Sequence, residues 1–409
     1  MQYRRMPQDS RSLSALGFGV MRLPLEGKRI NKTLSEALLR EALHQGVNYF
    51  DTAYPYINGQ SEPFLGQFLE ENRVRDKVAI ATKLPHWKTR NRGEMEAMLN
   101  HQLKRLRTDR IDYYLVHNIT GGSWNHLEQR GVLDFLSQAK QSGKILNVGF
   151  SWHGTTEDFP QVVDAAEWDF CQIQYNILDE RRQAGTAGLH YAAQKGLGVV
   201  IMEPLRGGRL ASNIPSQAQK AWANLPQKKP AEWALRWVWD KPEVTVLLSG
   251  FSCSDHLQES LKLVDEAQPE SLTKEEHEGI ALVQEAYHQA GAVGCTGCRY
   301  CLPCPFGVSI PDVFDWYNEW KTVRKERHQR LFYLATVGGL LSGKSGMAHR
   351  CTGCGACLKA CPQDLPIPDL MTTISKEYEG QWLQSLDKIG TGWKALMSRQ
   401  KKKRRNHQK

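Results

Sequence analysis

Cysteine is concentrated in one short part of this sequence. Eight of the ten cysteines fall between positions 295 and 361, in two runs that each end on a Cys-Pro pair. The runs are Cys295-x2-Cys298-x2-Cys301-x2-Cys304 and Cys351-x2-Cys354-x2-Cys357-x3-Cys361. Thiols clustered at such spacings indicate metal binding in a reducing compartment rather than a disulfide framework. Cys171 and Cys253 stand alone in apolar or loop surroundings, and we expect structural roles for them.

The second run resembles the cluster-binding motif of bacterial ferredoxins, and the resemblance implies a [4Fe–4S] cluster. A tight CxxCxxC turn points three thiolates at one cubane, and Gly353 and Gly355 permit positive φ angles in that turn. A pair of zinc sites is the alternative, because CxxC pairs also suit tetrahedral zinc. Zinc seldom uses three cysteines at this spacing with a fourth before proline, so the pattern favours iron–sulfur.

The first run is one residue shorter before its last cysteine, and this departure leaves the ligand partition open. In two-cluster ferredoxins the cysteine before proline ligates the other cluster. The resemblance therefore implies one cluster on Cys295, Cys298, Cys301 and Cys361, and a second on Cys351, Cys354, Cys357 and Cys304. The two runs share a similar exit, CPFGVSIP against CPQDLPIP, which suggests internal duplication. We expect two clusters, with a single cluster on the second run as the alternative.

Four polar residues lie at or just after predicted strands. Asp51, Lys83 and His117 end the second, third and fourth of these strands, and Tyr56 follows in DTAYPY. If the strands are parallel and close into a barrel, their carboxyl ends meet at one mouth, where such side chains come within reach of each other. Tyr54 could stand in for Tyr56, but the five-residue offset from Asp51 favours Tyr56.

The elements that must position these residues are eight short apolar runs. They are Leu16–Met21, Val47–Asp51, Val78–Lys83, Ile111–His117, Ile145–Ser151, Phe170–Tyr175, Gly198–Met202 and Val244–Ser249. Segments of helical periodicity, such as Leu34–Gln45 and Arg92–Leu106, alternate with them. This alternation predicts an α/β fold with parallel strands and right-handed crossovers. Eight units can close into a (β/α)₈ TIM barrel, although a doubly wound open sheet has the same alternation.

Seven pieces follow one another in an order that resembles the aldo/keto reductase family. They are LGFGVMRLP, NYFDTAYPY, ATK, DYYLVH, GFSWH, CQIQYN and MEPLRGG, and they span the barrel portion, residues about 10–265. The resemblance implies a barrel with the family's catalytic tetrad at Asp51, Tyr56, Lys83 and His117. Tyr56 would give a proton to a carbonyl oxygen, with its phenolate stabilised by Lys83. Asp51 would hold the lysine, and His117 would orient the carbonyl.

The resemblance also implies NADPH or NADH as the hydride carrier. The positions that would contact it are Gly19, Met21, Ser151, Gln172, Met202, Gly250 and His256. Met202 stands where some relatives stack a tyrosine on the nicotinamide. Gly250 and His256 stand where relatives that prefer NADPH often place Lys and Arg. Backbone amides at 251–254 could still receive a phosphate, so the choice between NADH and NADPH stays open.

Length and composition bound the remaining possibilities. The chain has 409 residues, too many for one ordinary domain, and its 41% hydrophobic and 24% charged residues are typical of a globular protein. No apolar run reaches the ~18 residues of a membrane span, and the N-terminus lacks a secretory h-region, so we expect a cytoplasmic protein. The net charge is +9, but Arg399–Lys409 carries seven Lys or Arg, leaving 9 − 7 = +2 elsewhere. Nucleic acid is therefore not an expected partner.

These patterns predict a barrel at residues 1–288, a mostly helical 4Fe-4S ferredoxin-like domain at 289–372, and a helical and basic tail at 373–409. Within them, Ser212–Pro230 is expected as a loop or extra helix, and Ile310–Arg330 as a helix. Trp87 and Trp124 follow Lys83 and His117, and either wall a substrate pocket or pack in surface loops.

The leading hypothesis is an NAD(P)-dependent oxidoreductase for a small carbonyl or alcohol substrate. Its clusters would exchange electrons with a redox partner protein, or serve the structure. A hydride carries two electrons and a cluster one, and no flavin signature is present, so nicotinamide and cluster lack an evident relay between them. One alternative is an electron-transfer protein whose barrel no longer reduces carbonyls. The altered residues at the nicotinamide positions favour this alternative. A nucleic-acid-binding regulator has only the basic tail in its favour and no base-reading motif.

Overall fold

The computed structural model describes residues 1–389, apart from 213, 227, 323–326 and 339–343. It divides into two compact units. The first comprises Met1–Arg206 and Gln227–Ile280, and the second comprises Gly207–Pro226 and the residues from Ala281 onward. The basic run predicted at Arg399–Lys409 lies outside the described residues. The domain limits expected from sequence remain predictions.

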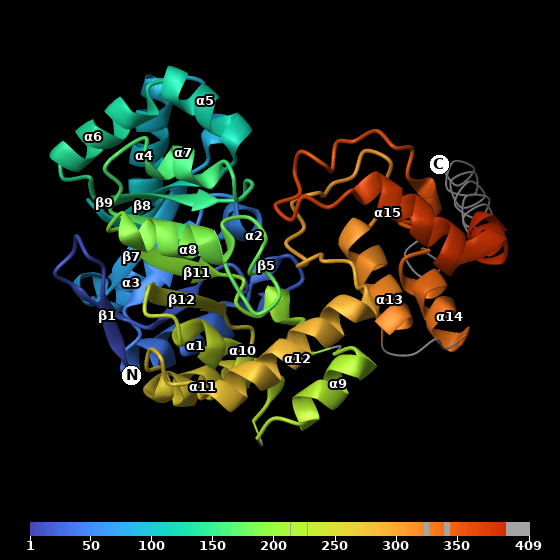
Figure 1. Ribbon diagram of the computed structural model, residues 1–409. Helices are drawn as coiled ribbons and strands as arrows, with labels where there is room; N and C mark the ends of the chain where they lie inside the picture. Colours follow the sequence, from blue (N-terminus) through green and yellow to red (C-terminus); the bar gives the residue numbers. More distant parts are fainter. Residues whose placement is uncertain (213, 227, 323–326, 339–343, 390–409) are drawn as a thin grey trace, which may run out of the picture. The chain divides into compact units, whose positions relative to one another are not determined.

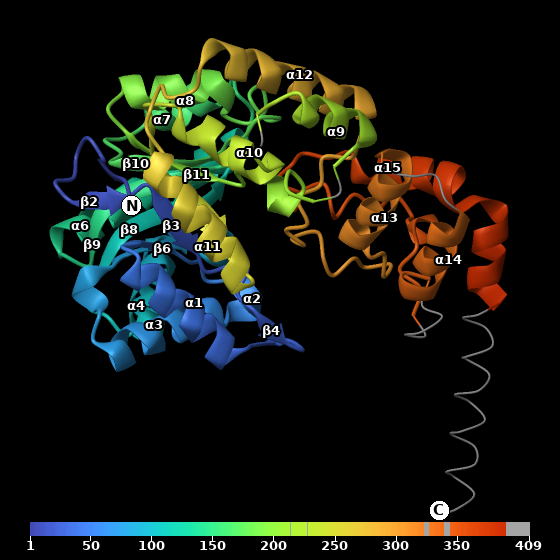
Figure 2. The same cartoon turned by 90° about the horizontal axis from the view of Figure 1, so that it is seen from below.

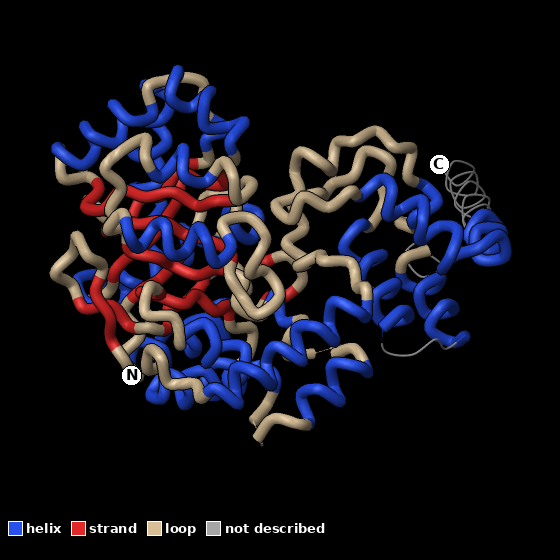
Figure 3. Tube along the Cα trace, in the orientation of Figure 1, coloured by secondary structure: helices blue, strands red, loops and turns tan. Residues whose placement is uncertain are grey.

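Eight parallel strands close into a barrel in the first unit (Figures 1 and 3). The strands are β3 (Leu16–Gly19), β6 (Tyr49–Asp51), β7 (Ala79–Leu84), β8 (Ile111–Ile119), β9 (Ile145–Trp152), β10 (Phe170–Gln174), β11 (Gly198–Met202) and β12 (Val244–Gly250). Each overlaps one of the eight predicted runs, and β7, β8, β9 and β12 continue one or two residues past the predicted ends. Lys83 and His117, expected as the last residues of their strands, therefore lie just inside β7 and β8. Ladder pairing continues from β12 back to β3, with Leu247 opposite Leu16, so the sheet has no free edge. The barrel prediction is confirmed, and the open doubly wound sheet is excluded.

Helices surround these strands, as the view in Figure 2 also shows. They are α1 (Lys32–His44), α2 (Tyr56–Gly59), α3 (Ser61–Asn72), α4 (Arg92–Leu106), α5 (Gly121–Gln129), α6 (Val132–Gln141), α7 (Phe159–Val163), α8 (Gly185–Gln194), α10 (Pro230–Trp239) and α11 (Ser254–Leu263). Helix α12 (Lys274–Ala290) continues along the chain from the first unit into the second. The strands are buried on both faces, as their near-continuous apolar sequences require.

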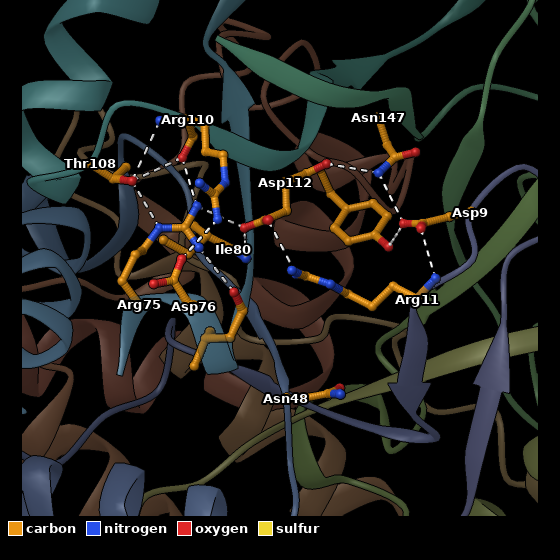
Figure 4. Close-up of polar contacts among 12 residues, drawn as sticks. Asp9, Arg11, Asn48, Arg75, Asp76, Ile80, Thr108, Arg110, Asp112 and Asn147 are labelled. Carbon is orange, nitrogen blue, oxygen red and sulfur yellow. Dashed lines mark hydrogen bonds and ion pairs between the residues drawn. The ribbon is translucent and has the colours of Figure 1, made fainter. Parts of the chain in front are cut away.

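A hairpin of β1 (Tyr3–Arg5) and β2 (Ser12–Ser14) precedes the barrel, and its Met6 and Leu13 pack in one buried cluster with barrel residues such as Tyr49 and Phe170. The loop between these strands enters a polar network, drawn in Figure 4. There the buried carboxylate of Asp112, near the start of β8, accepts hydrogen bonds from Arg11 at 3.1 Å and from the Ile80 amide at 2.8 Å. Arg75 forms an ion pair with it at 2.9 Å. In (β/α)₈ barrels the residues at the amino-terminal end usually stabilise the fold, because the active site lies at the carboxyl-terminal end.

The second unit is mostly helical, as predicted, with long loops that carry the cysteines (Figure 3). Its helices include α9 (Ser216–Ala223), α13 (Ile310–Thr322), α14 (Arg327–Thr336), α15 (Ile367–Ile374) and a π-helical turn, Ser375–Glu379. Helix α9 is the extra helix expected in Ser212–Pro230. The single helix expected over Ile310–Arg330 is instead divided between α13 and α14, and residues 323–326 between them lie outside the described residues. One apolar core, including Phe314, Tyr333 and Met371, holds the unit together.

Candidate active site and iron–sulfur centre

A buried ion pair lies at the carboxyl ends of β6 and β7. Asp51 is the last residue of β6, and the parallel register sets it opposite Ala81, two residues before Lys83. The Lys83 Nζ donates to both carboxylate oxygens of Asp51, at 2.6 and 2.7 Å, and to the Thr52 carbonyl at 2.9 Å. Lys83 and Asp51 are 1% and 3% exposed. Since neither charge has access to bulk water, each depends on the other.

The other two predicted residues of the tetrad lie beside this pair. Tyr56 begins α2, directly after the β6 loop, and its ring centroid is 5.1 Å from the Lys83 Nζ. His117, on β8, has its ring edge-on to Tyr56 with centroids 6.1 Å apart. The structure therefore brings Asp51, Tyr56, Lys83 and His117 together at one barrel mouth. Tyr54, the alternative to Tyr56, has its ring against Arg105 at 4.8 Å instead.

Burial sets the protonation states in this cluster. Burial raises the pKa of Asp51 and lowers the pKa of Lys83, and their mutual attraction opposes both shifts. The pKa of His117 is held well below its ordinary value, first by burial and then by the Lys83 charge. The imidazoles of His153 and His86 act in the same direction. His117 is therefore a neutral imidazole near neutral pH, and its buried Nδ1 has no hydrogen-bond partner within the described residues.

One buried charged residue next to this cluster was missed by the sequence analysis. Glu62, near the start of α3, is fully buried, and its carboxylate accepts hydrogen bonds from Thr82, Gln102 and Arg105. Most glutamates are exposed, so a Glu in the first turn of a predicted helix has no pattern that marks it as buried. Its position six residues after Tyr56 is the signal that could have drawn attention to it.

The positions implied for a nicotinamide cofactor lie on neighbouring strands. Ser151 and Gln172 are opposite each other in the β9–β10 ladder, and Gly19 lies between Gly250 and Asp51 in the β12–β3–β6 ladder. The Gln172 Oε1 is buried without a hydrogen-bond partner in the described part of the chain. An unpaired buried acceptor is costly, and a carboxamide N–H would satisfy it. The residues present thus fit a nicotinamide at this mouth.

The remaining implied contacts differ in exposure. Met21 and Met202 are half-buried, whereas His256 is exposed in the first turn of α11. A Cβ added to Gly19 would lie 3.3 Å from the Ser249 carbonyl oxygen, and one added to Gly250 would lie 3.1 Å from the Arg22 side chain. Larger residues at these two positions would therefore meet close neighbours.

The two tryptophans beyond the strand ends have different surroundings. Trp87 is 48% exposed, and its ring centroid is 5.2 Å from that of His117. Trp124 is fully buried and packs edge-on against Trp168 at 5.8 Å. Trp87 is thus placed beside the tetrad, while Trp124 belongs to the packing beneath α5.

In the second unit, thiols surround a cavity of about 180 Å³. Its lining includes Cys351, Cys354 and Cys357 of the second run together with Cys304, and also Cys301. Burial raises the pKa of Cys357, and its neighbouring thiols Cys351, Cys304 and Cys354 contribute to that rise. Gly353 and Gly355 have φ angles of 75° and 72°, as the tight turn was expected to need.

The other four thiols form a second group. Burial raises the pKa of Cys301 to about 12, and its neighbouring thiols are Cys298, Cys295 and Cys361. Cys361 is also among the thiols that raise the pKa of Cys295, whose sulfur accepts a hydrogen bond from the Gly297 amide at 3.4 Å. Cys304 thus neighbours the second run, and Cys361 neighbours Cys295 and Cys301 of the first. Among the described residues no three ligand side chains converge on the position of a single ion. A [4Fe–4S] cluster instead takes one thiolate on each of four irons, and four cysteines are its usual donor set, so the two groups have the chemistry for such a cluster.

Two family models match the chain. The model described as the aldo/keto reductase family matches residues 15–282, and the one described as a 4Fe-4S dicluster domain matches residues 294–365. The chain belongs to the aldo/keto reductase family. It is an oxidoreductase of this family with an iron–sulfur-binding region after the barrel, as the sequence analysis predicted.

Individual relatives support the family assignment for the barrel. This aldo/keto reductase is 26% identical over 356 residues to "Protein tas" of Escherichia coli, covering 71% of this chain and 98% of that protein. It is 26% identical over 304 residues to L-galactose dehydrogenase of Arabidopsis thaliana, covering 67% and 92%. The holo form of an aldo-keto reductase from Bacillus halodurans superimposes with a TM-score of 0.60 at 25% identity, covering 70% and 97%.

None of the helices between residues 1 and 389 that the structure describes combines the length and apolar character needed to cross a bilayer.

Proposed function

We propose that this aldo/keto reductase transfers a hydride between NADPH or NADH and a small carbonyl or alcohol substrate, with Tyr56 as the proton donor. The observation that carries the proposal is the buried Asp51–Lys83 pair, with the Lys83 ammonium 5.1 Å from the Tyr56 ring centroid. The family acts on small carbonyl compounds. When bound, the nicotinamide supplies or accepts the hydride.

The protein's own residues would donate and accept the proton that accompanies the hydride. A free phenol has a pKa near ~10, so Tyr56 alone is reluctant to cycle its proton near neutral pH. A neighbouring ammonium group favours the phenolate, and Lys83 is the cation in position to do so. Asp51 holds the Lys83 ammonium in place through two hydrogen bonds. Because the Asp51–Lys83 pair is already formed in the resting protein, little reorganisation is needed when negative charge develops on the Tyr56 oxygen.

His117 would orient the substrate rather than protonate it. A neutral imidazole donates one N–H hydrogen bond, and the lowered pKa of His117 keeps it in that form. The carbonyl oxygen would then accept from His117 on one side and from the Tyr56 hydroxyl on the other. Trp87, whose ring lies 5.2 Å from His117, would form part of the substrate wall.

For the cofactor, the unpaired Oε1 of Gln172 and its ladder neighbour Ser151 would hold the carboxamide. Met202, at the end of the next strand, would pack against the ring, and Gly19 and Met21 would leave room near Asp51. Gly250 and His256 flank the amino-terminal turn of α11, where backbone amides could receive a phosphate. Either NADPH or NADH is compatible with this arrangement.

The eight clustered cysteines would hold two [4Fe–4S] clusters. One would use Cys295, Cys298, Cys301 and Cys361, and the other Cys351, Cys354, Cys357 and Cys304. Such clusters supply one-electron transfer when present. Cys354 is exposed, so a partner protein could approach the second group closely. This favours exchange with a redox partner over a purely structural role.

A second candidate function is electron transfer by the clusters with a barrel that does not reduce carbonyls. It is favoured by Met202, Gly250 and His256, which depart from the residues of many relatives at the cofactor positions. Titration of the protein with NADPH and NADH, followed by nicotinamide fluorescence, separates the two. Absence of binding for both nucleotides would support the second candidate.

The proton-donor assignment is tested by Tyr56→Phe, with Tyr54→Phe as the matched control. Tyr56→Phe removes the hydroxyl and should lower kcat for carbonyl reduction by about 10²–10⁴-fold, with nicotinamide affinity almost unchanged. Tyr54→Phe should retain turnover, because its ring contacts Arg105 rather than the tetrad. Unimpaired turnover by Tyr56→Phe would refute the assignment.

A further inference from the structure

The buried carboxylate of Glu62 is held by three donors that come from two different elements. It accepts from the Thr82 hydroxyl at 2.7 Å, from the Gln102 Nε2 at 2.6 Å and from the Arg105 Nε at 2.7 Å. Glu62 is fully buried, and the Arg105 side chain is 16% exposed. Glu62 therefore sits at the centre of a closed polar network beneath the tetrad, rather than pairing at the surface.

One branch of the network leads to Lys83. The Gln102 Nε2 that bonds Glu62 also donates to the Lys83 backbone carbonyl at 3.0 Å. Gln102 is itself fixed, because its Oε1 accepts from the Tyr114 hydroxyl at 2.8 Å. The Thr82 hydroxyl bonds Glu62 from the residue just before Lys83. The backbone on both sides of the Lys83 Cα is thus tied to one carboxylate.

The other branch leads to the loop that carries Tyr56. The Arg105 Nη2 donates to the Gly59 carbonyl at 2.5 Å, and its guanidinium lies 4.8 Å from the Tyr54 ring centroid. Between these anchor points, Ile57 and Asn58 have left-handed φ angles of 50° and 54°. Such angles are strained for residues with a side chain and persist only when surrounding contacts hold them. Arg105, kept in place by Glu62, supplies such a contact.

We propose that Glu62 is a positioning residue for proton transfer, which sets the separation of Tyr56 and Lys83 by anchoring the β7 end through Gln102 and the Tyr56 loop through Arg105. The inference rests on the proposed function of the tetrad. The two anchored segments bring in the proton donor and its cation from different parts of the chain. A single buried carboxylate therefore controls whether they meet.

The charge of Glu62 also affects the pKa of Lys83, which gives the proposed role a measurable pH dependence. The groups that face Lys83 are Asp51 on β6, Glu62 on α3, His117 on β8 and the Tyr56 ring on α2. Burial lowers the pKa of Lys83, and the Asp51 and Glu62 charges oppose that shift. Removing the Glu62 charge lowers the pKa of Lys83 further. Lys83 then loses its proton at lower pH, and with it the charge that favours the Tyr56 phenolate.

The first test is Glu62→Gln, with Glu71→Gln as the matched control on the same helix. Glu71 has an exposed side chain and contacts Lys32 and Gln67 at the surface. In Glu62→Gln we expect the Tyr56 hydroxyl to be displaced by about 1 Å, which should lower kcat for carbonyl reduction by about 100-fold. KM should stay within about threefold of the wild-type value. The alkaline limb of the kcat profile should also move to lower pH, which a merely structural defect would not cause. Glu71→Gln should leave both unchanged.

The second test measures the loop directly, and covers the case in which Glu62→Gln does not fold. Arg105→Met keeps Glu62 but removes the hydrogen bond to Gly59. In hydrogen–deuterium exchange, peptides covering residues 54–60 should exchange faster in Arg105→Met and in folded Glu62→Gln than in Glu71→Gln. Wild-type exchange in this loop for Arg105→Met, or a wild-type kcat and pH profile for Glu62→Gln, would overturn the inference. If Tyr56→Phe retained turnover, the proposed function would fail instead.

Discussion

At the scale of single residues, the tetrad differs from a surface cluster of the same side chains because its members are buried. Lys83 is 1% exposed and His117 is 3% exposed, so the ammonium acts on the imidazole with little screening. A protonated His117 would be a second buried cation beside the first. The environment therefore keeps His117 neutral and leaves Lys83, paired with the Asp51 carboxylate, as the cation of the tetrad.

This neutral state has a pH consequence. The pKa of His117 is well below 6.5, so the imidazole stays unprotonated as the pH falls through that value. We expect kcat/KM for carbonyl reduction to show no acidic limb near pH 6.5 in the wild-type protein. The measurement is a pH–rate profile from pH 5.5 to 8, with His117→Gln for comparison. An acidic limb near pH 6.5 that disappears in His117→Gln would contradict the assignment of a neutral imidazole.

At the scale of elements, the two ends of the barrel have different roles. At the carboxyl end, the last residues of β6, β7 and β8 carry Asp51, Lys83 and His117, and α2 brings Tyr56 beside them. At the amino end, Asp112 joins β8 to the loop between β1 and β2 through Arg11, and to the turn before β7 through Arg75 (Figure 4). Its carboxylate also caps the Ile80 amide. This end shows no group arranged for catalysis among the described residues, and we interpret it as structural.

Removal of the Asp112 charge tests this interpretation. Asp112→Asn leaves two guanidinium groups without their buried counter-charge, and breaking a buried pair typically costs about 3–5 kcal/mol. We expect a marked fall in the thermal midpoint with kcat unchanged at temperatures where the variant is folded. Asp76→Asn is the matched control. Asp76 pairs with Arg110 at a side-chain exposure of 86%, and such a pair contributes about 1 kcal/mol at most. Equal thermal midpoints for Asp112→Asn and Asp76→Asn would contradict the structural role of Asp112.

At the scale of the whole molecule, both units are assembled from separate stretches of chain. The second unit takes Gly207–Pro226 from the segment after β11, and resumes at Ala281. The thiols show the same feature at smaller scale, because Cys304 neighbours Cys357 and Cys361 neighbours Cys301. Each predicted cluster would therefore tie the two cysteine runs together. Loss of either cluster should loosen both loops.

This crossing predicts which substitutions act alike. Anaerobically prepared wild-type protein should contain about eight irons per chain, as two [4Fe–4S] clusters require. Cys361→Ala and Cys295→Ala should each lose the same cluster, and Cys304→Ala and Cys354→Ala the other, as judged by the electron paramagnetic resonance of the reduced protein. If Cys361→Ala instead matched Cys354→Ala, each run would hold its own cluster, and the crossed partition would be wrong.

Local pattern was sufficient for much of this protein. Strand–helix alternation predicted all eight barrel strands, because buried parallel strands read as apolar runs of characteristic length. Asp51, Lys83 and His117 were identified because a strand end is visible in sequence, and all barrel strand ends face one mouth. The cysteine spacing identified an iron–sulfur region because a tight turn around a cluster needs thiols at fixed short intervals.

Tertiary structure decided what depends on contacts between distant residues. Only the pairing of β12 with β3 distinguishes a closed barrel from an open sheet, since both have the same alternation. Only packing shows that Glu62 is buried, because its partners Gln102 and Arg105 lie on another helix, about forty residues along the chain. Trp87 and Trp124 looked equivalent in sequence, yet one lies against His117 and the other within the core. Spacing along a chain records local geometry, whereas burial and charge pairing arise from which distant segments pack together.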